Sequence, residues 1–283
     1  MTAPPVSGDA PKFDLVIVAG RAARQYWRDL WRHRELLYFL TWRDVLVRYK
    51  QTVLGVAWAV IRPLVTIVIF TIIFGNIAHL PSEGVPYPVF VFAAMLPWQF
   101  LAAALSEASN SLTGNANLVS KVYFPRLIVP TSSVIVCFVD FLITAALLVV
   151  VLAWYGVAPT WHLLWLPLVV LHTVAAALGG GLWLAALNVN FRDFRYLVPF
   201  LVQIGMYVSP VGFSSTVVPD QWRMLYALNP VVGIVDSFRW AICGGVTQLH
   251  TPSLVFSWLL TLVLLTSGIW FFRRTERTFA DTI

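Results

Sequence analysis

Two ionisable side chains, Arg62 and Asp140, lie within long apolar segments of the sequence. An ionised group near the centre of a bilayer costs about 3 kcal/mol or more unless it is paired or hydrated. Arg62 lies roughly 12 Å into its segment and Asp140 roughly 20 Å into its own, at the rise of an α-helix. Arg62 either extends towards the lipid headgroups or faces a polar pathway that admits an anion. Asp140 has three open roles: an ion pair with Arg62, a hydrogen bond made while it is protonated, or a proton relay.

Aromatic residues also stand deep in apolar segments or beside polar residues, away from the usual aromatic belt at segment ends. These residues are Trp58, Trp98, Trp183 and Tyr207. A flat ring that carries one polar atom can stack against a sugar ring and donate a hydrogen bond to it. The positions therefore indicate the wall of a path for sugars, with ordinary helix packing as the alternative.

The sequence lacks the motifs of common enzymes and ATPases, namely G-x-x-x-x-G-K-[ST], H-E-x-x-H, G-x-S-x-G and the dinucleotide fingerprint. Its acidic residues are scattered, and Cys137 and Cys243 match no metal or redox spacing. We therefore expect no catalytic residue, no metal ligand and no cofactor bound by this chain. Any ATP is then hydrolysed by a different chain.

The apolar segments that would position these residues dominate the composition. Hydrophobic residues make up 59% of the 283 residues and charged residues 11%, whereas a soluble domain carries about 25% charged residues. Six segments approach the ~20 residues that cross a bilayer as a helix. They are 54–77, 88–106, 127–153, 163–187, 196–213 and 254–272. The sequence predicts an all-α integral membrane protein with six transmembrane helices in a domain over 51–274.

Lysine and arginine are distributed unevenly around these segments, and positive charge near helix ends favours the cytoplasmic side. Nine precede the first segment, three follow the last, and the connections at 107–126 and 188–195 carry Lys121, Arg126, Arg192 and Arg195. The connections at 78–87 and 154–162 carry none. We expect a multi-pass protein of the cytoplasmic (inner) membrane with both termini in the cytoplasm.

The amino-terminal region 21–50 is too charged to span a membrane. Aromatic residues such as Tyr26, Trp31, Tyr38 and Trp42 recur between arginines at helical spacing. This pattern predicts an amphipathic helix, or two, at the cytoplasmic interface, where it anchors to membrane lipids or meets a partner. Residues 1–20 and 275–283 are expected to be tails, the first of them flexible.

Two short helical patterns, at 219–228 and 231–243, interrupt the segment before the last span, and Asn229 and Pro230 join them. Each pattern is too short to cross the bilayer. Such a pair either dips into the membrane from outside, as re-entrant helices buried by their neighbours, or forms a surface hairpin. In the fourth span, small residues at 175–181 indicate close approach of another helix.

Several stretches together identify a family. They are 48–50; Leu54-Gly55, Trp58 and Arg62-Pro63; 96–98 with Phe100; 115–126; 187–193 with Pro199, Gln203 and Ser209-Pro210; and 228–230 with 233–240. In their order and spacing the chain resembles the membrane (permease) subunits of ABC exporters for O-antigens, teichoic acids and capsular polysaccharides. One departure is Ala94, where such proteins often carry glycine.

The resemblance implies a homodimer of six-helix subunits, each bound to a separate ABC ATPase (nucleotide-binding) subunit that uses ATP and Mg, in a two-plus-two complex. The implied substrate is a lipid-linked glycan that carries phosphate and many hydroxyls, in the inner membrane of a bacterium, and no nucleic acid is implied. Arg48, Lys50 and Arg62 would attract the phosphates at the cytoplasmic entrance. The expected substrate path comprises Arg48, Lys50, Trp58, Arg62, Trp98, Asp140, Trp183 and Tyr207.

The same resemblance gives roles to two connections. Residues 107–126 would form a cytoplasmic coupling segment on the ATPase, with Asn115, Asn117, Lys121, Tyr123 and Arg126; a plain connecting loop is the alternative. Residues 214–245 would form external gate helices, with Trp222, Asn229, Pro230, Asp236 and Arg239. Two other functions stay open: export of a drug or small lipid by the same kind of complex, and proton-coupled secondary transport through Asp140.

Overall fold

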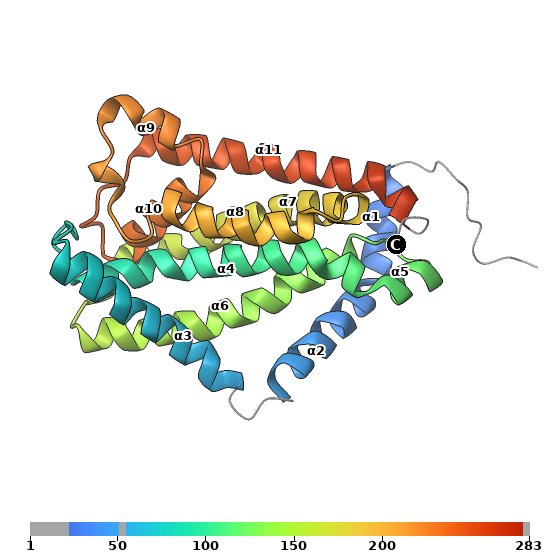
Figure 1. Ribbon diagram of the computed structural model, residues 1–283, viewed down its shortest axis with the longest axis horizontal. Coiled ribbons are helices and arrows are strands. Elements are labelled where there is room, and N and C mark those ends of the chain that lie inside the picture. The colour runs from blue at the N-terminus through green and yellow to red at the C-terminus, as the bar shows by residue number, and fades with distance from the viewer. Residues whose placement is uncertain (1–22, 51–54, 280–283) are drawn as a thin grey trace, which may run out of the picture.

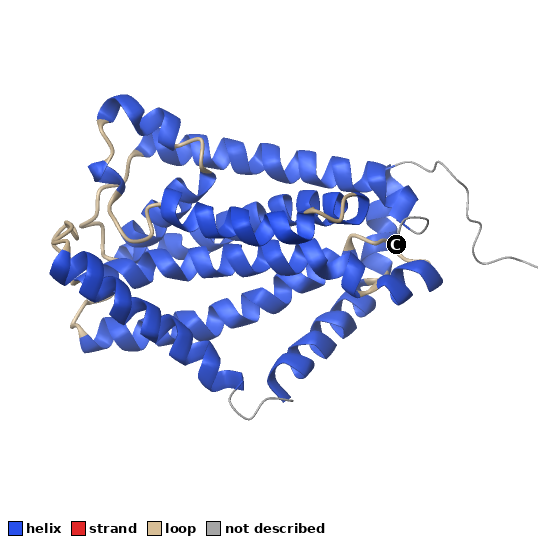
Figure 2. Cartoon of the chain, in the orientation of Figure 1, coloured by secondary structure: helices blue, strands red, loops and turns tan. Residues whose placement is uncertain are grey.

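The computed structural model describes residues 23–50 and 55–279, and every regular element in these two ranges is a helix (Figure 2). The all-α prediction is therefore confirmed for this part of the chain. The amino-terminal helices are α1 (Ala23–Arg32) and α2 (Arg34–Lys50). The long apolar helices are α3 (Gly55–Phe70), α4 (Tyr87–Gly114), α6 (Ile128–Trp154), α7 (Leu166–Asn190) and α11 (Thr251–Thr275). Helix α3 continues as the π-helix η1 (Thr71–Ile77), and the 3₁₀ turn η2 (Trp161–Trp165) precedes α7.

The remaining elements are shorter. They are α5 (Ala116–Lys121), α8 (Phe194–Val208), the 3₁₀ turn η3 (Ser215–Val217), α9 (Asp220–Tyr226), α10 (Pro230–Ile242) and the 3₁₀ turn η4 (Glu276–Thr278). All of them except α8, which packs against α4 and α7, lie towards the two ends of this bundle (Figure 1). Figure 1 shows α1, α5 and the end of α11 at one end of the bundle, and α9 and the start of α10 at the other. These are called the α5 end and the α9 end below.

Within the described residues, five helical segments are long and apolar enough to cross a membrane: Val60–Ile77, Tyr87–Gly114, Ile128–Trp154, Trp161–Asn190 and Thr251–Thr278. They correspond to five of the six predicted spans. The predicted span at 196–213 corresponds to α8, which has 15 residues and a length of about 22 Å. A hydrocarbon core is about 30 Å thick, so the sixth span stays a prediction.

Helix α4 lies at the centre of the bundle and packs against α6, α7, α8 and α10. Its segment from Val89 to Ala94 is fully buried, and the surrounding apolar side chains form the main core. By contrast, only 11% of the Val60–Ile77 window is buried, and the exposed side chains of α3 are largely apolar. An apolar surface this extensive is typical of contact with lipid or with another membrane-embedded chain.

Small residues bring α7 close to α11, as the run at 175–181 predicted. A Cβ atom added at Gly179 would lie 2.7 Å from the backbone nitrogen of Leu265, and one added at Gly181 would lie 2.9 Å from the Cβ atom of Ala108 in α4. Glycine therefore allows α7 to approach two neighbouring helices at once.

A second hydrophobic cluster occupies the α5 end. It unites Leu40 of α2, Phe124, Leu127 at the start of α6, and Phe272 with Phe279 at the carboxyl end of the described chain. Phe272 and Phe279 are fully buried and pack edge to face with their ring centroids 5.3 Å apart. The region predicted as a carboxyl-terminal tail therefore begins with residues that are folded against the bundle.

Other predicted boundaries also shift. The region 23–50 forms two helices, one of the alternatives that the sequence left open. Helix α4 continues to Gly114, past the predicted end at residue 106, so the first part of the 107–126 segment is helical. The two short helices between α8 and α11 are confirmed as α9 and α10, whereas their re-entrant placement in a membrane stays a prediction.

Candidate functional site

A cavity of about 870 Å³ lies among α2, α3, α4 and α6. Figure 1 shows α2 and α3 converging on the flank of the bundle next to α6. The charged side chains on the cavity wall are Arg48, Arg62, Glu107 and Asp140, and the wall is otherwise mainly apolar and aromatic. Its remaining lining residues include Tyr49, Trp58, Thr66, Met95, Trp98, Gln99, Phe100, Phe141 and Thr144.

Arg48 connects three helices at this cavity. From the end of α2 its guanidinium group forms an ion pair with Asp140 of α6 and a second one, at 2.9 Å, with Glu107 of α4. Tyr49 donates a hydrogen bond to the other carboxylate oxygen of Asp140. Among the roles left open for Asp140, an ion pair is thus observed, but its partner is Arg48 and not Arg62.

The Tyr49 hydroxyl is held in its protonated form. Burial, and then the hydrogen bond to Asp140, raise the pKa of Tyr49. The carboxylate of Asp140 therefore receives two donors from consecutive residues of α2. This arrangement compensates a charge that lies roughly 18 Å along α6 from Ile128, at a depth where an unpaired carboxylate is costly.

Arg62 contributes the second cation of the cavity wall. Its Cζ atom lies 6.0 Å from the centroid of the Trp58 ring, and both residues are exposed. A guanidinium group can bind phosphate oxygens through two parallel hydrogen bonds, and a ring beside it can contact a sugar. The site thus combines two guanidinium groups, two carboxylates and indole rings within one cavity.

Five of the eight predicted path residues line this cavity: Arg48, Trp58, Arg62, Trp98 and Asp140. The other three lie outside it. Lys50 is exposed at the end of α2 and Tyr207 is exposed on α8. Trp183 donates a hydrogen bond of 3.1 Å to Ser267 and stacks on Phe271 with ring centroids 4.1 Å apart, at the contact between α7 and α11.

Two residues of the charged cluster, Tyr49 and Glu107, were absent from the predicted substrate path. Glu107 was assigned to a connection, although Leu96, Gln99, Ala103 and Glu107 recur every three or four residues and all line the cavity. That helical spacing was the available signal. Tyr49 follows Arg48 in a region assigned to the membrane interface, where a hydroxyl gave no indication of a buried partner.

The predicted coupling residues lie at the α5 end and fall into two groups. Asn117, Lys121 and Tyr123 are exposed, and Tyr123 keeps 72% of its surface accessible. Asn115 and Arg126, which flank α5, are instead bound to other parts of the chain. The exposed group thus lies on and directly after α5, between two points that are bound to other parts of the chain.

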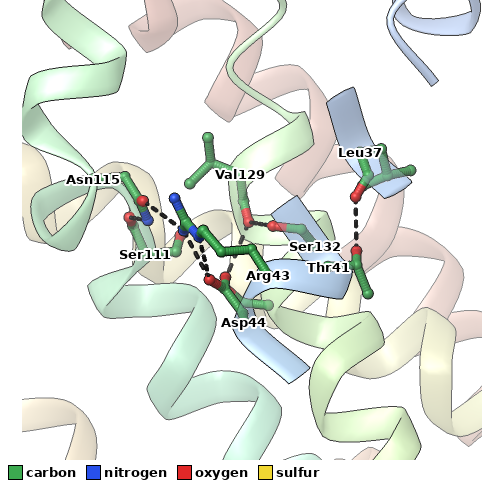
Figure 3. A network of polar contacts seen from close by, with 9 residues as sticks. Leu37, Thr41, Arg43, Asp44, Ser111, Asn115, Val129 and Ser132 are labelled. Carbon is green, nitrogen blue, oxygen red and sulfur yellow. Dashed lines mark hydrogen bonds and ion pairs between the residues drawn. The ribbon is translucent and has the colours of Figure 1, made fainter. Parts of the chain in front are cut away.

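Asn115 is bound by α2, as Figure 3 shows. The Arg43 guanidinium group of α2 donates a hydrogen bond of 3.1 Å to the Asn115 side-chain oxygen and is itself paired with Asp44 at 2.8 Å. The Asn115 amide in turn donates to the Ser111 carbonyl in the last turn of α4.

The predicted external gate residues lie at the α9 end. Asn229 caps α10 because its side-chain oxygen accepts from the Val231 backbone nitrogen, and Pro230 occupies the first turn. Trp222 is exposed on α9. Asp236 is buried and lines a small polar cavity of about 110 Å³.

Arg239 of α10 is buried with 2% of its surface exposed. Its guanidinium group donates to the carbonyl oxygens of Phe90, Val211 and Phe213 at 2.9–3.2 Å and lies 3.7 Å from the centroid of the Phe90 ring. This single side chain therefore connects α10 to α4 and to the turn that follows α8.

Comparison with known proteins places the whole arrangement in a family. Residues 35–243 match the family described as ABC-2 type transporter. The chain belongs to the ABC-2 type transporter family. The matched range includes every residue that lines the large cavity, together with α5 and α10, whereas α1, α11 and η4 lie outside it.

Three relatives of this ABC-2 type transporter chain are similar over most of their length. An O-antigen export system permease protein RfbA from Klebsiella pneumoniae is 28% identical over 250 residues, which cover 88% of this chain and 95% of that protein. The protein of the same name from Myxococcus xanthus is 28% identical over 259 residues, which cover 90% of this chain and 98% of that protein. The polysialic acid transport protein KpsM of Escherichia coli is 23% identical over 248 residues, which cover 83% of this chain and 91% of that protein. The expected kinship with membrane subunits of ABC exporters is thus confirmed.

Proposed function

We propose that this chain is the permease subunit of an ATP-driven ABC exporter that moves a lipid-linked polysaccharide across the cytoplasmic membrane of a bacterium. The observation that carries the proposal is the similarity to permeases of O-antigen export and to a polysialic acid transport protein over 88%, 90% and 83% of the chain. In this proposal the α5 end faces the cytoplasm, and both termini lie there.

The large cavity supplies groups that suit such a substrate. Arg48 and Arg62 attract the phosphates that link glycan and lipid, and the rings of Trp58 and Trp98 contact sugars. Asp140 and Glu107 hold the Arg48 guanidinium group in ion pairs. A phosphate that enters the cavity competes with these carboxylates for the same donors, so binding and rearrangement of α2 are linked.

ATP hydrolysis belongs to a separate ABC ATPase subunit in this proposal, because the sequence has no phosphate-binding loop of its own. The exposed face of the coupling segment, with Asn117, Lys121 and Tyr123, is the proposed contact with that ATPase. Two copies of the permease and two of the ATPase form the complex, and ATP with Mg is bound by the ATPase alone.

The short helices α9 and α10 are the proposed external gate. They lie at the end of the bundle opposite α5 (Figure 1), and Arg239 holds α10 against α4. Re-entrant helices in this position close the outer side of the path while the ATPase subunits are apart. Trp222 and Asp236 belong to the same gate.

A drug or small-lipid exporter is the nearest alternative, and a proton-coupled transporter is a more distant one. The Asp140 carboxylate is occupied by donors from Arg48 and Tyr49, which disfavours a role as a proton relay. If neutralising Asp140 abolished transport while ATP hydrolysis stayed coupled to the permease, the proton-relay alternative would gain support.

Affinity purification of the tagged chain from its native membrane tests the proposal. We expect an ABC ATPase and a phosphate-linked glycolipid to co-purify, both identified by mass spectrometry. Recovery of a lipid without sugar would support the alternative exporter, and a pure permease without any ATPase would contradict the two-component complex. A tagged membrane protein of unrelated family from the same strain is the control for non-specific lipid.

A further inference from the structure

Glu276, at the start of η4, contacts two parts of the chain that are far away in the sequence. One carboxylate oxygen accepts a hydrogen bond of 2.9 Å from the Tyr26 hydroxyl of α1. The other accepts one of 2.6 Å from the backbone nitrogen of Arg126, and the Arg126 side chain donates to the backbone carbonyl of Glu276. The residue therefore binds α1 and the connection that leads from α5 into α6.

The surroundings of this contact are apolar. The second hydrophobic cluster includes Phe272 and Phe279 on either side of Glu276, with Tyr26 packed against it. The Arg273 guanidinium group lies 4.5 Å from the centroid of the Tyr26 ring. Burial, and then the Glu276 carboxylate, raise the pKa of the Tyr26 hydroxyl, so it retains the proton that it donates.

Helix α5 is consequently held on both sides by contacts with other parts of the chain. Arg43 of α2 binds Asn115 before α5 (Figure 3), and Glu276 binds Arg126 after it. The exposed side chains between Asn115 and Arg126 belong to α5 and to the two residues that follow it. A displacement of α5 is then transmitted to the amino-terminal helices and to the end of α11.

We infer that Glu276 is a positioning residue that ties the coupling segment to α1 and α11, so that these three elements move as one unit when an ATPase displaces α5. The inference rests on the proposed function. The family match covers residues 35–243, so it includes Arg126 but not Tyr26 or Glu276. Loss of the tie uncouples ATP hydrolysis from movement of the substrate.

The first test compares variants in the purified complex of permease and ATPase, reconstituted in vesicles with polyprenyl-diphosphate-linked glycan extracted from a strain that lacks this permease. E276A removes both side-chain acceptors, whereas E276Q keeps one, and the backbone carbonyl that accepts from Arg126 stays in both variants. We expect E276A to leave assembly and ATP hydrolysis within about twofold of the parent and to lower the glycan moved per ATP about tenfold, a typical size for coupling between sites. E276Q should have a smaller effect.

Tyr26 provides a double-mutant test of the same contact. Y26F alone should reduce the glycan moved per ATP, and Y26F added to E276A should reduce it no further, because the two residues act through one hydrogen bond. Glu35 and Tyr38 are exposed on α2, so E35Q and Y38F are the matched controls and should behave as the parent. The inference would be overturned if the two substitutions lowered the glycan moved per ATP additively. It would also be overturned if the variants lowered only the thermal stability and left the glycan moved per ATP unchanged.

A second measurement does not depend on any glycan. Spin labels on Val122→Cys, next to α5, and Trp270→Cys, on α11, report the distance between the two elements; both positions are exposed. The labelled permease is diluted with unlabelled permease, so that most complexes carry one labelled copy. With Glu276 present, we expect one narrow distance distribution in the complex that ATP leaves unchanged, and with E276A a broad one. If the parent distance changes on ATP addition, the elements do not move as one, even if the proposed function holds. If the distances behave as expected but the parent moves no glycan, the proposed function fails and the tie stands.

Discussion

At the scale of single residues, Arg48 illustrates how a membrane domain can accommodate a charge. The guanidinium group has carboxylates from α4 and α6 on either side, and its side chain keeps 31% of its surface accessible from the cavity. It is therefore paired with carboxylates and also accessible to an anion. An accessible cation without a carboxylate partner would be costly to place in a membrane domain, and a paired but fully enclosed cation could not contact an anion.

Removing Arg48 should destabilise the chain because it leaves Asp140 without its ion pair. We expect R48A to lower the free energy of unfolding by ~1 to 3 kcal/mol, a range reduced from that of fully buried pairs because this pair is partly exposed. Thermal unfolding of the purified chain in detergent measures the change. The double variant R48A/D140A should recover part of the loss, and R192A, at an exposed arginine, is the control. A double variant less stable than R48A would contradict the pairing.

Trp58 gives a residue-scale prediction about the substrate. The ring is 50% exposed and lines the cavity, so W58A should change stability little and weaken binding of the glycan. A ring contact worth about 1 kcal/mol corresponds to about fivefold in apparent affinity. The measurement is the concentration dependence of ATP-driven transport. Trp154 is 84% exposed at the end of α6, and an equal loss in W154A would argue against a specific role for Trp58.

The sequence could predict much of this site because charged and aromatic residues within apolar segments are costly or unusual wherever they occur. Arg62, Asp140, Trp58 and Trp98 were identified in that way. The partner of Asp140 could not be identified, since Arg48 belongs to a segment that looks interfacial and the contact spans 92 positions of sequence. Only tertiary structure brings the end of α2 to the middle of α6.

At the scale of elements, the contact between α7 and α11 depends on the absence of side chains. The hypothetical Cβ atom of Gly179 would meet backbone atoms of Leu265 at 2.7–2.8 Å, and backbone cannot rotate away as a flexible side chain can. We expect G179A to destabilise the chain by about 1 to 3 kcal/mol through overpacking. The yield of monodisperse protein after solubilisation and its thermal midpoint measure this loss.

Gly114 supplies the matched control for that substitution. It ends α4, and a Cβ atom added there would have no atom within 4 Å. G114A should therefore retain the parent's stability and yield. Equal losses in both variants would mean that helix propensity or expression, and not the close contact, determines the outcome.

The lengths of helices were harder to predict than their existence. Helix α4 was expected to end at residue 106, where the sequence becomes polar with Ser106, Glu107, Ser109 and Asn110. In the structure this polar stretch stays helical because it faces polar partners: Asn188 of α7 donates to the Ser109 carbonyl at 2.8 Å and to the Asn110 side chain at 3.2 Å. Local composition alone cannot reveal a partner 78 positions away.

At the scale of the whole molecule, the orientation of the bundle is a prediction from the distribution of lysine and arginine. Tyr123, next to α5, and Trp222, on α9, are exposed, and both native cysteines are buried. Helices α5 and α9 lie at opposite ends of the bundle (Figure 1). In intact cells, a membrane-impermeant thiol reagent should modify Trp222→Cys but not Tyr123→Cys. After permeabilisation of cells that lack the partner ATPase, which would otherwise cover Tyr123, both should react. Labelling of Tyr123→Cys in intact cells would contradict the inside-out assignment, and the parent chain shows the background from Cys137 and Cys243.

The central claim is that this chain forms the path for a lipid-linked polysaccharide whose movement is driven by ATP on a partner subunit. The most direct measurement places the permease and its co-purifying ATPase in sealed vesicles and follows protection of polyprenyl-diphosphate-linked glycan from an external glycosidase. We predict that glycan changes sides only with hydrolysable ATP, and that R48A and R62A together abolish the movement while ATPase subunits remain bound. Movement without ATP, or glycan that never crosses although the complex hydrolyses ATP and is intact, would contradict the claim.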